Sequence, residues 1–284
     1  MKYAGFFVNL DRDGERRAKM ELQLATMGLT EVYQRFPAAE GNARNFPNPH
    51  IKNGEIGAFT SYYLLLKENL GRRLPLHIIE DDILLARCMT PTIHSIIDAG
   101  LFETYDIIYT DTQIPTSNVY YKTYKTLFDK ITKRDAAGKV TEATFQLVAL
   151  RDGKFGTASS LLIGPRSIAK LHDLYEAELR SGAQLPVDLF VWREVTRGTL
   201  KAACLFPFIT SLRLEHSIET TLAERYDQLS ILARDIARVS FFVDRDLNLI
   251  RDYLNKYVPL ADDPHLQILM HILGFSFTDK FVDI

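Results

Sequence analysis

The strongest constraint on the fold is an alternation of short apolar runs with helix-like segments along the first 211 residues. YAGFFVNL (3–10), LHII (76–79) and AACLFPFITS (202–211) are strand-like runs. Residues 12–29 instead space their apolar side chains three or four positions apart, as one face of a helix requires. Such alternation favours helices packed on a mostly parallel sheet. We therefore predict an α/β domain over residues 1–216.

The remaining residues, 217–284, follow a different pattern. Leu222, Tyr226, Leu229 and Val239 share one face of a helix-like stretch, which predicts a helical segment packed on the first domain. A membrane-surface helix is the alternative. The segment carries eleven acidic residues against seven Lys and Arg, a balance that disfavours binding to anionic lipid.

Composition excludes several classes of function. The net charge of −2 lacks the basic excess of a nucleic-acid binder. No run approaches 18 apolar residues, so we expect no transmembrane helix and at most peripheral membrane association. The two cysteines, Cys88 and Cys204, lie in apolar surroundings and suggest free thiols in a reducing compartment. We predict a cytoplasmic location. The alternative is a place at the inner face of the bacterial inner membrane.

Three carboxylates interrupt the apolar run LHIIEDDILL. Glu80, Asp81 and Asp82 follow directly after a buried strand, where an unpaired charge would be costly. In α/β sheets ligands bind at the carboxyl ends of the strands, so we expect these acids to face a cleft. Carboxylates of this kind suit a hard divalent cation shared with substrate phosphates. A solvated strand end or a helix cap is the alternative.

Six blocks of sequence carry a resemblance to a known family. They are FVNLDRDGERR (7–17), RFPAAEG (35–41), GEIGAFTS (54–61), LPLHIIEDDILL (74–85), GTASSLLI (156–163) and PVDLF (186–190). In this order the blocks resemble bacterial glycosyltransferase family 25, which includes lipooligosaccharide galactosyltransferases.

The resemblance implies a GT-A type, Rossmann-like fold and an inverting transfer from a UDP-sugar, commonly UDP-galactose, in lipooligosaccharide or lipopolysaccharide biosynthesis. The implied partners are a saccharide or glycolipid acceptor and a divalent cation, Mn²⁺ in the first instance. The oligomeric state is not predicted. Two other classes stay open: a non-catalytic binding module of the same fold, and a nucleotidyltransferase or phosphohydrolase that uses the same acids. The sequence lacks the glycine-rich loop GxxxxGK[ST], which disfavours the latter.

The resemblance also assigns residues to roles at the metal and the donor. The metal ligands are Glu80, Asp82 and, as the best-placed late histidine, His216. The donor-site candidates come from the first strand and its turn, from the turn after the second strand, and from the acidic triplet: Asn9, Asp11, Arg12, Arg16, Glu40, Gly41 and Asp81.

Asp188 in LPVDLF is the predicted general base. The cap of the following helix is the alternative role for this residue. Asp111 and Glu215 are the competing candidates for the base. The family often has a histidine where this chain has Tyr62, so the role of Tyr62 is an open question.

Overall fold

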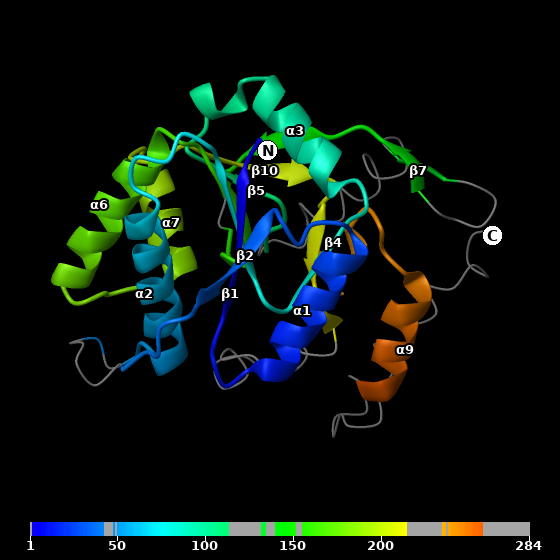
Figure 1. The fold of residues 1–284 in the computed structure, drawn as a ribbon, viewed down its shortest axis with the longest axis horizontal. Helices are drawn as coiled ribbons and strands as arrows, with labels where there is room; N and C mark the ends of the chain where they lie inside the picture. Colours follow the sequence, from blue (N-terminus) through cyan, green and yellow to red (C-terminus); the bar gives the residue numbers. More distant parts are fainter. Residues whose placement is uncertain are drawn as a thin grey trace.

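A computed structural model gives the fold of the chain. The structure describes residues 2–42, 48, 50–113, 132–134, 140–151, 155–214, 235–236 and 238–257. Within these, only the backbone is described for 132–134, 140–143, 247 and 254–257. A layer of helices lies on each side of one central sheet (Figure 1).

Seven strands make the central sheet, in the order β2-β1-β3-β9-β5-β10-β8. In that order their bounds are Tyr33–Pro37, Ala4–Asn9, Leu76–Glu80, Ser160–Ile163, Ile107–Tyr109, Ala202–Phe206 and Gln146–Ala149. β1 pairs in parallel with β2 and β3, and β10 with β5. β9 is antiparallel to both β3 and β5, and β8 is antiparallel to β10. Five strands therefore share one direction, which confirms the predicted α/β class with a mostly parallel sheet.

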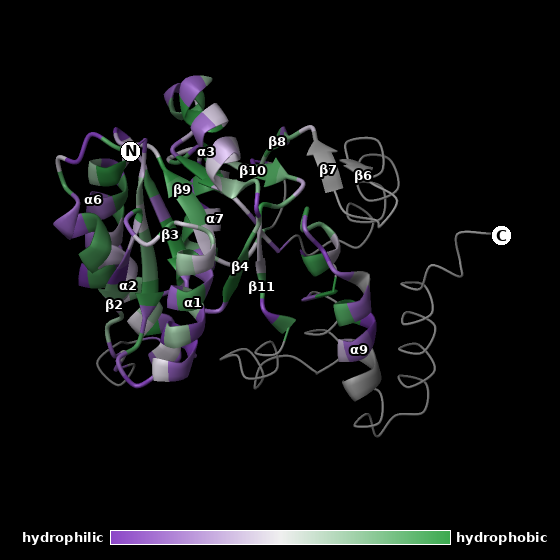
Figure 2. Ribbon diagram, turned by 45° about the vertical axis from the view of Figure 1, so that its right-hand side comes forward, coloured by the Kyte–Doolittle hydropathy of each residue, from purple (hydrophilic) through white to green (hydrophobic). Residues whose placement is uncertain are grey.

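The sheet is buried on both faces, because alternate residues of each strand pack against different helices. Phe6 and Ile78 belong to the core under α2 (Asn53–Glu68), α6 (Ser167–Arg180) and α7 (Val187–Thr196). Their neighbours Phe7 and Ile79 belong to the opposite core, under α1 (Gly14–Thr26) and α3 (Met89–Asp98). Burial on both sides explains why the strands are continuous apolar runs (Figure 2).

Smaller elements complete the described fold. β4 (Ile83–Leu85) pairs with β11 (Thr210–Leu212), and β6 (Thr132–Arg134) pairs with β7 (Val140–Ala143), both antiparallel. A short 3₁₀ helix spans Leu101–Glu103. No helix in the described part of the chain is long and apolar enough to cross a membrane. Cys88 and Cys204 are free thiols, as predicted.

The segment after residue 234 packs against the linker that follows β10. The Phe208 N–H donates to the Phe241 carbonyl at 2.9 Å, and the Val243 N–H donates to the Phe208 carbonyl at 2.9 Å. The described helical parts are residues 235–236, 238–240 and α9 (Leu247–Tyr257). Most of the predicted helical segment 217–284 lies outside the described residues, so the domain division stays a prediction.

A row of hydrogen bonds between buried polar side chains runs across the strands of the sheet. His77 Nδ1 is hydrogen-bonded to the Tyr33 hydroxyl, and His77 Nε2 lies 3.1 Å from Ser160 Oγ. Ser160 Oγ lies 2.5 Å from Thr110 Oγ1, which lies 2.8 Å from Thr210 Oγ1. Each group thus finds its partner inside the protein, as a buried polar group requires. Burial lowers the pKa of His77 to about 3, so the imidazole is neutral in the folded state.

This histidine makes stability depend on pH. The pKa of an unfolded histidine is about 6.5, so His77 takes up a proton on unfolding as the pH falls below that value. Its contribution to the free energy of unfolding is complete above pH 6.5 and is lost as the pH falls toward 3. Between pH 6.5 and 5, we expect the free energy of unfolding of the wild type to fall by about 2 kcal/mol more than that of His77→Gln. Urea unfolding at several pH values measures this difference, and parallel curves for the two proteins would contradict it.

Candidate active site

A cavity of about 760 Å³ opens at the carboxyl ends of β1 and β3. Its wall is built from the turns that follow β1, β2 and β3, the N-terminal half of α2, the loop before β9 and the start of α7. β11 and two residues of the C-terminal segment, Asp235 and Arg238, complete the wall. Segments far apart in the sequence thus meet at one edge of the sheet, as expected for a ligand site in an α/β protein.

The acidic triplet lies in this wall. Glu80 is the last residue of β3, and Asp81 and Asp82 form the turn into β4. Glu80 thus still belongs to the strand, while the other two acids lie in the turn that leaves it. Burial, and then repulsion from Asp82, raises the pKa of Glu80 to about 8. The shift arises first from the loss of hydration on burial, and the neighbouring carboxylates add to it.

Asp81 is held from behind by the first strand. Its Oδ2 accepts a hydrogen bond of 2.6 Å from the Asn9 side-chain amide, and both residues are buried. Arg35 in turn donates to Asn9 Oδ1 at 2.9 Å and to Asp11 at 2.5 Å. Asn9 thus lies behind the acid and orients it, while Asp11 lies outside the cavity wall in an exposed ion pair.

Two arginines of the first turn and helix reach the cavity. The Arg16 guanidinium lies 3.6 Å from Asp81 and 3.7 Å from Asp82, and so partly neutralises both. Arg12 forms an exposed ion pair of 2.5 Å with Glu40 at the mouth. An exposed pair of this kind contributes little to stability, so Arg12 can exchange Glu40 for an anionic ligand at small cost.

The turn after β2 packs directly on α2 through two glycines. A Cβ on Gly41 would lie 1.7 Å from the Asn53 carbonyl oxygen, and a Cβ on Gly57 would lie 2.7 Å from the Ala39 carbonyl oxygen. Ser61 fastens the contact, because its hydroxyl accepts the Ala39 N–H at 2.8 Å. Only glycine allows this approach at residue 41, which explains its place beside Glu40.

Asp188 lies in the first turn of α7 and points to the loop before β9. Its Oδ2 accepts the Thr157 N–H at 3.1 Å, and its Oδ1 accepts the Leu189 N–H at 2.9 Å. Pro186 occupies the N-cap position, so Asp188 is not the cap residue itself. Thr157 has a positive φ of 68°, an uncommon conformation for a residue other than glycine.

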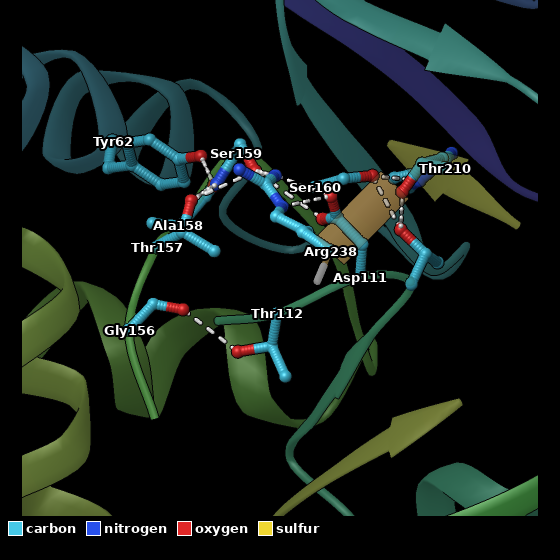
Figure 3. A network of polar contacts seen from close by, with 12 residues as sticks. Tyr62, Asp111, Thr112, Gly156, Thr157, Ala158, Ser159, Ser160, Thr210 and Arg238 are labelled. Atoms are coloured by element: carbon cyan, nitrogen blue, oxygen red, sulfur yellow. Dashed lines mark hydrogen bonds and ion pairs between the residues drawn. The ribbon is translucent and has the colours of Figure 1, made fainter. Parts of the chain in front are cut away.

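Tyr62 fixes the same loop from the side of α2. Its buried hydroxyl donates to the Ala158 carbonyl (Figure 3). Tyr62, which stands where the family often has a histidine, is thus a structural link in this chain. It holds the backbone between Thr157 and Ser159.

Asp111, a competing candidate for the base, is already paired with an arginine. It is fully buried at the end of β5, and Arg238 contacts its Oδ2 through both Nε, at 2.8 Å, and Nη2. Such a carboxylate is poorly placed to take a proton from a substrate.

The structure brings together eight of the predicted site residues in the cavity wall. These are Arg12, Arg16, Glu40, Gly41, Glu80, Asp81, Asp82 and Asp188. Asn9 and Asp11 lie outside the wall, and His216 and Glu215 lie outside the described residues. Within the described part of the chain, no group of three or more His, Cys, Asp or Glu side chains is arranged to hold a metal ion.

The comparisons with known proteins identify a family. A sequence model described as glycosyltransferase family 25 (LPS biosynthesis protein) matches residues 3–191. No curated protein sequence matches the chain. Among solved structures, the galactosyltransferase LgtC, in complex with donor and acceptor sugar analogues, is similar at 12% identity with a TM-score of 0.32. That likeness covers 71% of this chain and 72% of the other.

Tyr62→Phe tests the link between α2 and the loop before β9. The change leaves the buried Ala158 carbonyl without this donor, so we expect the free energy of unfolding to fall by about 1–3 kcal/mol. Tyr63→Phe is the matched control, since the adjacent hydroxyl makes a longer bond, of 3.3 Å, to the half-buried Glu176. Denaturant unfolding compares the two variants, and equal losses would show that the Tyr62 hydroxyl has no special role.

Proposed function

Because the chain belongs to glycosyltransferase family 25, we propose that it transfers a sugar, galactose in the first instance, from a UDP-sugar to a saccharide hydroxyl of a cell-surface glycan such as lipooligosaccharide. The observation that carries this proposal is the cavity at the sheet edge, which combines arginines with the acidic triplet. Its volume of about 760 Å³ is typical of a small-molecule site.

The charge of the wall supports a divalent cation in this site. Among the described lining residues, four arginines face eight acids: Arg12, Arg16, Arg213 and Arg238 against Asp13, Glu40, Glu55, Glu80, Asp81, Asp82, Asp188 and Asp235. A nucleoside diphosphate would be repelled by this excess of negative charge. Divalent cations such as Mg²⁺ are often held by one or two carboxylates together with substrate phosphates, which suits a wall without a complete cage.

Glu80 and Asp82 are the proposed ligands of that cation. Both supply carboxylate oxygens at the end of β3, and a cation would offset the burial and the repulsion from Asp82 that together raise the pKa of Glu80. Asp81, whose side chain is oriented by Asn9, is proposed to bind the sugar donor. A bound cation supplies Lewis-acid stabilisation of the charge that grows on the departing diphosphate.

The chain's own cationic groups are proposed to orient the donor. Arg16 lies next to the acids, and Arg12 lies at the mouth beside Glu40 and Gly41. An arginine can pair with phosphate oxygens through two parallel N–H groups, so these two residues are suited to hold the diphosphate end of the donor.

Asp188 is proposed to accept the proton of the acceptor hydroxyl. Inverting transfer needs a base on the acceptor side, and Asp188 faces the cavity from the start of α7. Thr157 N–H holds one of its oxygens in place at 3.1 Å. Its competitor Asp111 is paired with Arg238, which favours Asp188 for this role.

A panel of UDP-, GDP-, CMP- and dTDP-sugars, with and without Mn²⁺, tests the donor and the cation together. We expect UDP-galactose with Mn²⁺ to raise the melting temperature and to release UDP when a saccharide acceptor is present. Asp82→Asn should remove both Mn²⁺-dependent effects while leaving the protein folded. The exposed surface acid Asp98 gives the matched control, Asp98→Asn. Undiminished turnover of Asp82→Asn in a chelator would contradict the cation site.

Asp188→Asn tests the base. The amide keeps the size of the side chain but cannot take a proton, so we expect kcat to fall about 10²–10⁴-fold with little change in the KM for the donor. Asp173→Asn, an exposed acid on α6, is the control. Loss of donor binding would instead place Asp188 in the donor site, and a lowered melting temperature with normal kcat would show that its role is structural.

A further inference from the structure

Arg238 lies outside the part of the chain that the family model matches, yet it lines the cavity. The match ends at residue 191. Arg238 is carried by a short helical stretch whose apolar side chains, Ile236 and Val239, are buried. Phe241 then packs on Phe206, with ring centroids 5.1 Å apart. These contacts dock the segment on β10 and bring the guanidinium into the sheet edge.

The guanidinium bridges two strand ends. Nε and Nη2 of Arg238 contact Asp111 at the end of β5, and Nη2 also donates to Ser159 Oγ just before β9 (Figure 3). Ser159 also accepts the Glu80 N–H through its carbonyl at 2.8 Å. The side chain and the carbonyl of Ser159 therefore join Arg238 to the end of β3, where the acidic triplet begins.

A continuous set of hydrogen bonds leads from Arg238 to Asp188. Thr157 Oγ1 donates to Ser159 Oγ at 3.0 Å and accepts the Ser159 N–H at 3.3 Å. These bonds surround Thr157, whose φ is 68°, and its N–H then reaches Asp188 Oδ2. A residue in such a conformation persists only when its surroundings hold it. Arg238 is the charged group at the far end of this set.

We propose that Arg238 is a positioning residue of the transfer reaction, which fixes the Thr157–Ser159 loop and through it the carboxylate of Asp188. This proposal rests on the proposed function for its kinetic consequence, but its structural part does not. On this proposal, the site is complete only when the segment that carries Arg238 is docked. The part of the chain matched by the family model would then be insufficient for full activity.

The chemistry of the contact requires arginine. The planar guanidinium donates to Asp111 and Ser159 at once, whereas the single ammonium of lysine lacks this fixed fork. Removal of Arg238 alone would leave the buried Asp111 charge without its partner, and Arg238→Ala is therefore liable to unfold. Arg238→Lys keeps the charge, and the double variant Arg238→Met with Asp111→Leu removes both charges; each is designed to fold.

Two measurements test the proposal. Hydrogen exchange should show the Thr157 amide exchanging at least about tenfold faster in Arg238→Lys and in the double variant than in the wild type. Both variants should also lower kcat about 10- to 100-fold, with the donor KM changed less than about twofold, because the base is displaced rather than removed. The double variant should melt close to the wild type and still be slow, which a purely stabilising role of Arg238 would not produce.

Asp244→Ala is the matched control. Asp244 ties the same segment to the chain at Arg87, through bonds of 2.8, 3.3 and 3.1 Å, away from the cavity wall. We expect its Thr157 exchange and kcat to match those of the wild type. Wild-type exchange in Arg238→Lys would overturn the proposal. So would equal effects from Asp244→Ala in a protein whose Val243 amide, bonded to Phe208 in the docked segment, keeps its wild-type exchange. If the wild type turned over no donor sugar, the proposed function would fail while the exchange measurement still decided the role of Arg238.

Discussion

The burial of neighbouring carboxylates is the constraint on which the site depends. Residues 80–82 and Asp111 bring four carboxylates to one edge of a sheet that is buried on both faces. Asp81 and Asp111 are buried, so each of these two carboxylates needs a local partner. Asn9 and Arg16 contact Asp81 of the triplet, and Arg238 pairs with Asp111. The loops around the cavity are arranged to deliver these partners, and a cation bound with the donor would complete the compensation.

Local sequence patterns predicted the α/β class and several of its elements. Apolar runs located β1, β3 and β10, and helical spacing located α1, because both features depend on a few neighbouring residues. They did not predict that β9 runs antiparallel between β3 and β5. A strand buried on both faces has the same apolar composition in either direction, so its orientation is decided by connections and not by periodicity.

The candidate site was predictable to the extent that its residues are unusual where they stand. The acids after β3 are conspicuous within an apolar run, and they do line the cavity. The Arg238–Asp111 pair was missed, since its members are 127 positions apart and neither belongs to a local motif. The role of Tyr62 was equally hidden, because its partner is the backbone carbonyl of Ala158 and any residue would supply one.

The contact between Gly41 and Gly57 has a consequence for the thermodynamics of binding. The turn after β2 and the N-terminal half of α2 are in close backbone contact, with no room for a side chain at residue 41. This wall has therefore given up its conformational entropy during folding, before any ligand arrives. A donor that lies against Glu40 and Gly41 would not have to order the wall, and more of its contact energy would remain as affinity.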